Sequence, residues 1–184
     1  MYLINTYRLK VIFLIATIAV GIYTIISFTK ESVPEEIQIS YNDLIINHIT
    51  NTPFTGRIVD TLADKIITYD VVDGIRNGEF IVTQIDGKKS VSGTIVNNKN
   101  EGKWSYYYST GELESEGYFK NDLLSDKWVW YYKNGNVMEE GVFVKGKRDG
   151  LWKLYKEDGS IKKFVFFKNG EIINSVDVTS RAAS

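Results

Sequence analysis

The sequence predicts an all-β protein, an elongated antiparallel meander of tandem 24-residue β-hairpin repeats, preceded by one N-terminal transmembrane helix. First, aromatic residues and glycines recur at a fixed step of 24 residues, and a period of about 20 to 50 residues indicates a repeat architecture. Second, polar and apolar residues alternate between the glycines, as they do in strands. Third, an uncharged apolar segment lies near the N-terminus. The recurring positions are Trp104, Trp128 and Trp152; Tyr107, Tyr131 and Tyr155; and Gly111, Gly135 and Gly159.

The predicted transmembrane helix covers residues 11–28, VIFLIATIAVGIYTIISF, which carry no charge. Such a helix extends roughly 27 Å, close to the bilayer core of about 30 Å. Arg8 and Lys10 precede it and acidic residues follow, which favours a cytoplasmic N-terminus, residues 1–10, and repeats outside the cytoplasm. The alternative is a cleaved signal peptide, but no A-x-A cleavage pattern follows. We therefore expect an uncleaved anchor.

Four segments follow the predicted anchor. Residues 29–38 contain a proline and three glutamates and are predicted to be a linker. Residues 39–52 are predicted to be a capping segment, and their pattern fits either a strand pair or a short lead-in. The β-hairpin repeats are predicted over 53–172, and a C-terminal tail over 173–184.

Two kinds of turn are predicted to join the strands. One sits at Thr110-Gly111, with equivalents Asp86-Gly87, Asn134-Gly135 and Asp158-Gly159; Asn-Gly and Asp-Gly favour a two-residue type I′ turn. The other lies at positions that also recur every 24 residues and tolerate a left-handed backbone. Those positions are Gly74, Asn98, Asp122 and Gly146.

A two-residue loop sets the register of each hairpin. If Ser109 pairs with Glu112, Trp104 lies opposite Gly117, and we expect the indole to cover the backbone of that glycine. The same count places Trp128 opposite Gly141, Phe80 opposite Gly93, and Trp152 opposite Val165. The sheet should contain eight to ten strands.

Alternation places aromatic side chains on one side of the sheet, here called the aromatic face. The opposite side, the mixed face, carries a row of tyrosines among glutamates and lysines. The aromatic residues either cover one another or bind a protein partner, since Trp and Tyr are common interface anchors. The partner-binding candidates are Trp104, Tyr106, Tyr108, Trp128, Trp130, Tyr132 and Trp152. The other predicted members of the aromatic face are Leu113, Phe119, Val137 and Phe143.

At these positions the sequence resembles the bacterial MORN-repeat variant family, whose units read approximately G-x-W-x-x-Y-Y-x-x-G followed by G-x-[YF]. The match runs from Gly102 through Trp104, Tyr107 and Gly111 to Phe119, and it recurs from residues 126 and 150. The resemblance covers roughly residues 53–172 and implies a bacterial hairpin-repeat protein, and together with the predicted anchor it favours the cell envelope. Many such proteins are regarded as the antitoxin of a toxin–antitoxin pair, and eukaryotic relatives act as membrane-associated scaffolds that bind phosphoinositides. The departures from the pattern are Asp126 and Val165, where glycine is expected, and Lys156, where tyrosine is expected.

Few residues could support catalysis or metal binding. The chain has no cysteine and one histidine, His48, and its glycines do not form a phosphate-binding loop. Glu112, Glu114 and Glu116 alternate along one strand and invite comparison with paired catalytic carboxylates, but they fit the wet side of an amphipathic strand better. We expect no enzyme, no cofactor and no metal.

The charge balance of 22 basic and 23 acidic residues does not favour nucleic-acid binding. The first hypothesis is a membrane-anchored module that binds an unidentified protein partner. The alternatives are an antitoxin whose partner is a toxin, and a scaffold that binds anionic lipid through the basic last repeat.

Overall fold

The computed structural model describes residues 37–39 and 44–178. The predicted transmembrane helix over 11–28 lies outside these residues, as do the predicted cytoplasmic N-terminus, most of the linker and the end of the tail. Within the described part of the chain, no helix is long and apolar enough to cross a membrane.

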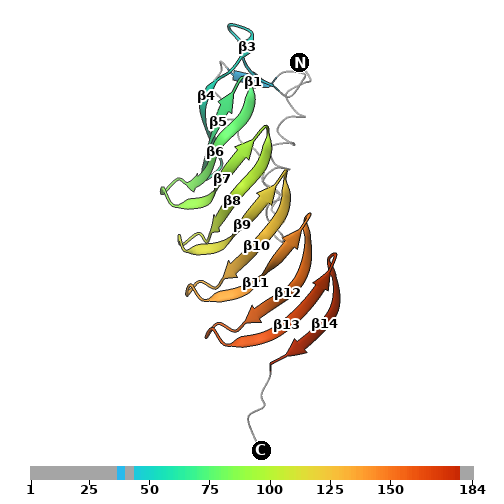
Figure 1. Cartoon of the computed structure of the whole chain (residues 1–184). Helices are drawn as coiled ribbons and strands as arrows, with labels where there is room; N and C mark the ends of the chain where they lie inside the picture. The colour runs from blue at the N-terminus through green and yellow to red at the C-terminus, as the bar shows by residue number, and fades with distance from the viewer. Residues whose placement is uncertain (1–36, 40–43, 179–184) are drawn as a thin grey trace, which may run out of the picture.

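The described residues form strands that follow one another in chain order (Figure 1). β1, β2 and β3 form a three-stranded sheet, and β4 to β14 form an eleven-stranded sheet in which every strand pairs antiparallel with its neighbours in sequence. The predicted meander is confirmed, with more strands than the eight to ten expected. At about 4.8 Å per strand the sheet is roughly 48 Å long. The strands are β1 (Ile37–Ile39), β2 (Ile45–Asn47), β3 (Thr52–Pro53), β4 (Gly56–Leu62), β5 (Lys65–Val72), β6 (Ile75–Gln84), β7 (Lys89–Val96), β8 (Lys99–Tyr107), β9 (Leu113–Lys120), β10 (Leu123–Tyr131), β11 (Val137–Val144), β12 (Lys147–Tyr155), β13 (Ile161–Lys168) and β14 (Glu171–Asp177).

The turns along one long edge differ from the prediction. At the β8–β9 turn, the Tyr108 N–H donates to the Glu112 carbonyl at 2.9 Å, and the Gly111 N–H donates to the Tyr108 carbonyl at 2.9 Å. The loop therefore has three residues, with Gly111 left-handed at φ 107°, rather than the predicted two-residue type I′ loop. Ser109 consequently does not pair with Glu112. The equivalent glycines have φ of 88° at Gly87, 84° at Gly135 and 83° at Gly159.

The type I′ geometry occurs at the other long edge instead. Asn97 and Asn98, between β7 and β8, have φ of 50° and 63°, and two successive positive φ angles define that turn. The prediction that these positions adopt a left-handed backbone is confirmed. The remaining pairs are Asp73-Gly74, Asn121-Asp122, Lys145-Gly146 and Asn169-Gly170.

A bulge near each three-residue turn restores the predicted register. Tyr107 pairs with Leu113 whereas Tyr106 pairs with Ser115, so one extra residue, Glu114, is accommodated in β9. Beyond this bulge Trp104 lies opposite Gly117, as predicted. The predicted loop was one residue too short, and the bulge was not predicted. The two errors cancel in the register, so the predicted partner of Trp104 is correct.

A second bulge lies within each strand that carries a tryptophan. In β8, residues 102–104 lie opposite the single residue Gly93, because Thr94 pairs with Glu101 and Ser92 with Ser105. Gly102 takes a φ of 70° at this bulge. Asp126 occupies the equivalent position one unit later with φ 57°, a conformation that aspartate tolerates better than most residues.

The indoles of Trp104, Trp128 and Trp152 each cover a glycine, but not the predicted one. A Cβ added to Gly117 would lie 2.1 Å from the Trp128 ring, so the covering ring comes from the following strand and not from the paired Trp104. The same holds for Gly93 under Trp104 and Gly141 under Trp152. Each such glycine thus precedes its tryptophan by 11 residues. The residue 11 positions after Val165 is Val176 and not a tryptophan, so no indole requires a glycine at position 165.

The core is a ladder of aromatic rings along the sheet. Consecutive ring centroids lie 5.1 to 6.2 Å apart, mostly edge to face, a favourable geometry for aromatic pairs. Each buried indole N–H donates to a backbone carbonyl, for example Trp128 to Tyr118 at 3.0 Å. The rings are Phe80, Trp104, Phe119, Trp128, Phe143, Trp152 and Phe167.

The β4 end of the large sheet is covered by the preceding segment. Ile45 of β2 is buried against Ile58 and Val71, and its N–H donates to the Gly74 carbonyl at 2.8 Å. Of the two alternatives for residues 39–52, the strand arrangement is observed, although β1 begins inside the predicted linker. At the other end, β14 continues to Asp177, so its last five residues are strand where a tail was predicted.

Candidate interaction surfaces

Three of the four predicted tryptophan anchors lie inside the aromatic ladder. Trp104, Trp128 and Trp152 are only 1%, 3% and 0% exposed. A partner could contact their rings only after displacing the side chains that cover them. The rings cover one another to this extent, which was one of the two alternatives for the aromatic face.

Tyr106 and Trp130 lie beside the ladder and are half-buried. Their rings stack on Trp128 at centroid distances of 6.2 and 5.6 Å. Burial raises the pKa of Tyr106, because the phenolate would lose its hydration. Its hydroxyl is buried without a hydrogen-bond partner among the described residues.

Tyr108 and Tyr132 tie adjacent repeats together. The Tyr108 hydroxyl donates to the Tyr131 carbonyl at 2.6 Å, and the Tyr132 hydroxyl donates to the Tyr155 carbonyl at 2.9 Å. Both contacts join one hairpin to the next at the edge of the three-residue turns. This geometry gives the two tyrosines a structural role, and partner binding by any of the seven candidates stays a prediction.

The aromatic face also carries an ion pair that the sequence analysis did not identify. Arg148 pairs with Glu139, and its guanidinium lies 4.0 Å from the centre of the Trp152 ring. Burial raises the pKa of Glu139, and the nearby Arg148 charge opposes that rise. Strict alternation from Phe143 places Glu139 on this face, so the pattern contained the signal.

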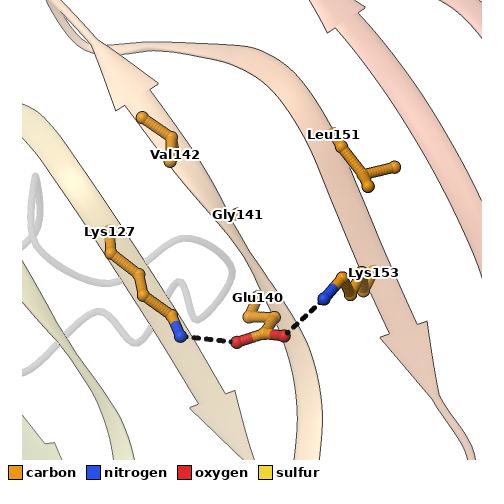
Figure 2. Close-up of a pocket in the computed structure, with 6 residues that line it drawn as sticks. All are labelled: Lys127, Glu140, Gly141, Val142, Leu151 and Lys153. Atoms are coloured by element: carbon orange, nitrogen blue, oxygen red, sulfur yellow. Dashed lines mark ion pairs between the residues drawn. The ribbon is translucent and has the colours of Figure 1, made fainter.

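The mixed face carries a repeated cluster of lysine, glutamate and tyrosine. The Glu140 carboxylate on β11 lies 2.7 Å from the Lys127 ammonium and accepts a 2.7 Å hydrogen bond from the Tyr155 hydroxyl. Lys153 approaches it from the other side at 3.7 Å (Figure 2). One unit earlier, Glu116 pairs with Lys103 at 2.8 Å and accepts from Tyr131 at 3.2 Å.

These contacts change the acidity of the cluster. The hydrogen bond from Lys127, and after it the one from Tyr155, holds the pKa of Glu140 below its ordinary value of 4.5. Burial, and after it the hydrogen bond to Glu140, raises the pKa of Tyr155 to about 12. Glu140 therefore stays ionised and paired, which makes it a poor proton acceptor near neutral pH. Glu116, considered above as a catalytic carboxylate, likewise contacts one lysine and one tyrosine.

A shallow hollow of about 180 Å³ lies over this cluster (Figure 2). It is smaller than the roughly 300 to 1,000 Å³ of most small-molecule sites. Its apolar wall is formed by Val142 and Leu151, which are both 41% exposed, and the equivalent position one repeat before Val142 holds Tyr118, 43% exposed. The described residues contain no group of three or more His, Asp or Glu side chains placed to hold a metal ion.

The fold and its surfaces define a β-hairpin repeat protein with one core face and one open face. The family model of the MORN repeat variant matches residues 100–121, 127–145 and 148–169, so this part of the chain is a MORN repeat module. The predicted resemblance is confirmed for these three units, whereas the predicted units between 53 and 99 lie outside the match. No curated protein matches the chain.

Proposed function

We propose that the chain is a non-enzymatic module, anchored in a bacterial membrane by residues 11–28, that binds a protein partner through its mixed face. The observation that carries the proposal is the exposed apolar pair of Val142 and Leu151 beside lysine–glutamate pairs, with Tyr118 exposed at the equivalent position two strands away. An apolar centre with a polar surround is the usual arrangement of a protein interface.

The mixed face is favoured over the aromatic face because the two differ in what a partner must displace. On the aromatic face the indoles are buried, and binding there would disturb the core. On the mixed face the apolar side chains are already exposed, and Lys127 and Lys153 are held by Glu140. Binding would order few additional side chains, which lowers its entropic cost.

The test is affinity capture from native membranes with the full chain in mild detergent. The informative variant carries Tyr118→Glu and Leu151→Glu, and the matched control carries Val59→Glu, which changes a residue 54% exposed on β4. A protein retained by the wild type and by the control, but lost from the double variant, supports the mixed face. Equal retention by all three chains counts against it, provided that circular dichroism shows a folded sheet in each.

The predicted anchor is tested separately. We expect the full chain to stay in the membrane pellet after alkaline carbonate extraction, and a chain lacking residues 11–28 to be released. Protease added to intact spheroplasts should digest the repeats if they lie outside the cytoplasm. Release of the full chain by carbonate would contradict the anchor without affecting the mixed-face proposal.

The same surface would serve an antitoxin, since neutralising a toxin is one form of partner binding. Similarity to the repeat family is the only support for this narrower role. Expression of a small neighbouring reading frame should then be lethal only without this chain, and the Tyr118→Glu, Leu151→Glu variant should fail to protect.

Binding to anionic lipid has a different structural basis. Lys145 is the first residue of one type I′ turn and Lys147 follows that turn, and Lys147 lies 3.7 Å from the Cβ position of Gly170 in the next. Lys145 and Lys147 thus place two basic side chains at this edge of the sheet. Flotation with anionic liposomes at low salt, lost in Lys145→Glu, Lys147→Glu, is the expected result if lipid is the ligand.

A further inference from the structure

The last strand of the large sheet, β14, has an open edge. All seven of its residues are exposed, and Ile172, Ile173 and Val176 expose 64%, 67% and 48% of their surface. Within the described part of the chain, β14 pairs only with β13. A strand with unpaired backbone groups and apolar side chains is a template for another strand.

The two ends of the large sheet differ in whether other residues cover them. The β4 end is covered by the capping strands, which bury Ile45 against Ile58 and Val71. At the β14 end Arg148 lies over Trp152 and Phe167, which closes the aromatic ladder but leaves the backbone edge open. β14 also contains neither lysine nor proline, the residues that commonly guard an edge strand.

The hydrogen-bond pattern shows which backbone groups face outward. The Val178 N–H donates to the Lys162 carbonyl at 2.9 Å, and Phe164 is the partner of Val176. Hydrogen-bonded and non-hydrogen-bonded pairs alternate in an antiparallel ladder, so Ser175 and Asp177 direct their N–H and carbonyl groups away from β13. These groups are the ones that an added strand would use.

The charges on β14 indicate what kind of strand fits. Its only charged residues are acidic, Glu171 at one end and Asp177 at the other, where Asp177 also pairs with Lys163 of β13 at 3.5 Å. If two copies of β14 paired antiparallel along their whole length, Glu171 of one copy would lie near Asp177 of the other at both ends. Like charges placed opposite each other destabilise a strand pair, whereas opposite charges stabilise it.

We propose that β14 is a β-augmentation site for an extended strand of a partner protein, with apolar residues at alternate positions and a lysine or arginine at each end. The added strand would continue the eleven-stranded sheet by backbone hydrogen bonds, with its apolar side chains contacting Val176 on the mixed face, while Ile172, opposite Phe167, lies on the aromatic face. This site is separate from the apolar pair on β11 and β12 and does not depend on a partner binding there.

The probe is a fluorescent peptide of alternating threonine and valine with a lysine at each end, titrated with the full chain in detergent at low salt. Ser175→Pro removes an outward N–H and is compatible with an edge strand, whereas Ser175→Ala keeps it. We expect Ser175→Pro to weaken binding about tenfold or more and Ser175→Ala to leave it unchanged. Equal tryptophan fluorescence and thermal unfolding of the two variants shows that β13 and the core are intact.

Two further probes separate strand addition from non-specific attraction. A peptide N-methylated at alternate residues should not bind, because it cannot form the backbone bonds, and a peptide with glutamate at each end should bind more weakly than the lysine peptide. Overturning results are equal binding of the lysine and glutamate peptides, equal binding by Ser175→Pro, or no binding at about 1 mM. Self-association of the chain that Ser175→Pro abolishes would also overturn it, in favour of pairing between copies.

Discussion

The strands from β4 to β7 and the strands from β8 to β13 share one backbone plan but have different cores. The first set buries mainly aliphatic side chains, such as Ile58, Ile67 and Ile95, whereas the second set buries the tryptophan and phenylalanine ladder. Both sets use type I′ turns along one edge and three-residue turns along the other, except at the β4–β5 turn, where Ala63 and Asp64 form a two-residue loop. The family match covers only the second set. The fold therefore depends on the turns and bulges, and the indoles are one way to fill its core.

The same comparison shows how the indole position constrains another residue. Where the ladder has tryptophan, the residue 11 positions earlier is glycine, as at Gly117 and Trp128. Where it has Phe80, the earlier residue is Tyr69, and the two lie opposite each other. A smaller side chain leaves room for a Cβ on the neighbouring strand. The glycine is therefore required by the neighbouring indole, which leaves no space for a Cβ, and not by the backbone conformation of the repeat.

The largest expected effect comes from removing one indole from the ladder. Trp128→Ala should lower the free energy of unfolding by about 3 to 5 kcal/mol, because Trp128 is 3% exposed and contacts rings on both sides. Ile67→Val, in the aliphatic set, should cost only about 0.5 to 1.5 kcal/mol. Urea unfolding followed by circular dichroism measures both. Equal losses would show that the ladder is no more important than the aliphatic core.

The next effect tests the pairing of glycine and tryptophan. Gly117→Ala places a Cβ about 2.1 Å from the Trp128 ring and should cost about 1 to 3 kcal/mol. In a Trp128→Ala background the same change should cost much less, because the obstructing ring is absent. A double-mutant cycle with zero coupling energy would refute the pairing.

A smaller pair of opposite effects tests the bulge position. Gly150 has a φ of 73° and no atom near its Cβ position. Gly150→Ala should therefore lower the free energy of unfolding by about 1 kcal/mol through backbone strain alone. Asp126→Gly should instead stabilise by a few tenths to about 1 kcal/mol, since Asp126 has φ 57° in the equivalent place. The thermal midpoints of the two variants should move in opposite directions. A shift in the same direction would mean that backbone conformation does not decide this position.

The smallest effect concerns the mixed face and pH. The pKa of Glu140 lies below 4.5 in the folded chain, so its contribution to stability is present above that pH and is lost as the pH falls through the lower folded value. Lys127→Met removes the largest cause and should make the acid branch of the stability curve shallower, by no more than about 1 kcal/mol. The exposed Lys120→Met serves as control, and an identical acid branch in the two variants would exclude this linkage.

The sequence could predict the strands and the register because the period and the alternation are local properties of the chain. It could not distinguish a three-residue turn with a bulge from a two-residue turn, because both return Trp104 to the same partner, Gly117. It also could not show which neighbouring strand supplies the ring over Gly117, since strands on both sides carry tryptophan. The candidate anchors were predicted from residue type and alternation, whereas burial depends on how neighbouring rings pack. The Arg148–Glu139 pair could have been inferred from alternation.

Pairing of each strand with its sequence neighbours alone has a consequence for length. Because no strand of the large sheet crosses over another, a change of 24 residues adds or removes two strands without altering the rest. Each such step changes the long dimension by roughly 10 Å. The number of repeats therefore sets the length of the sheet. Duplication of one unit in the gene would move the β14 end away from the β4 end by a fixed increment, and loss of one unit would bring the two ends closer by the same amount.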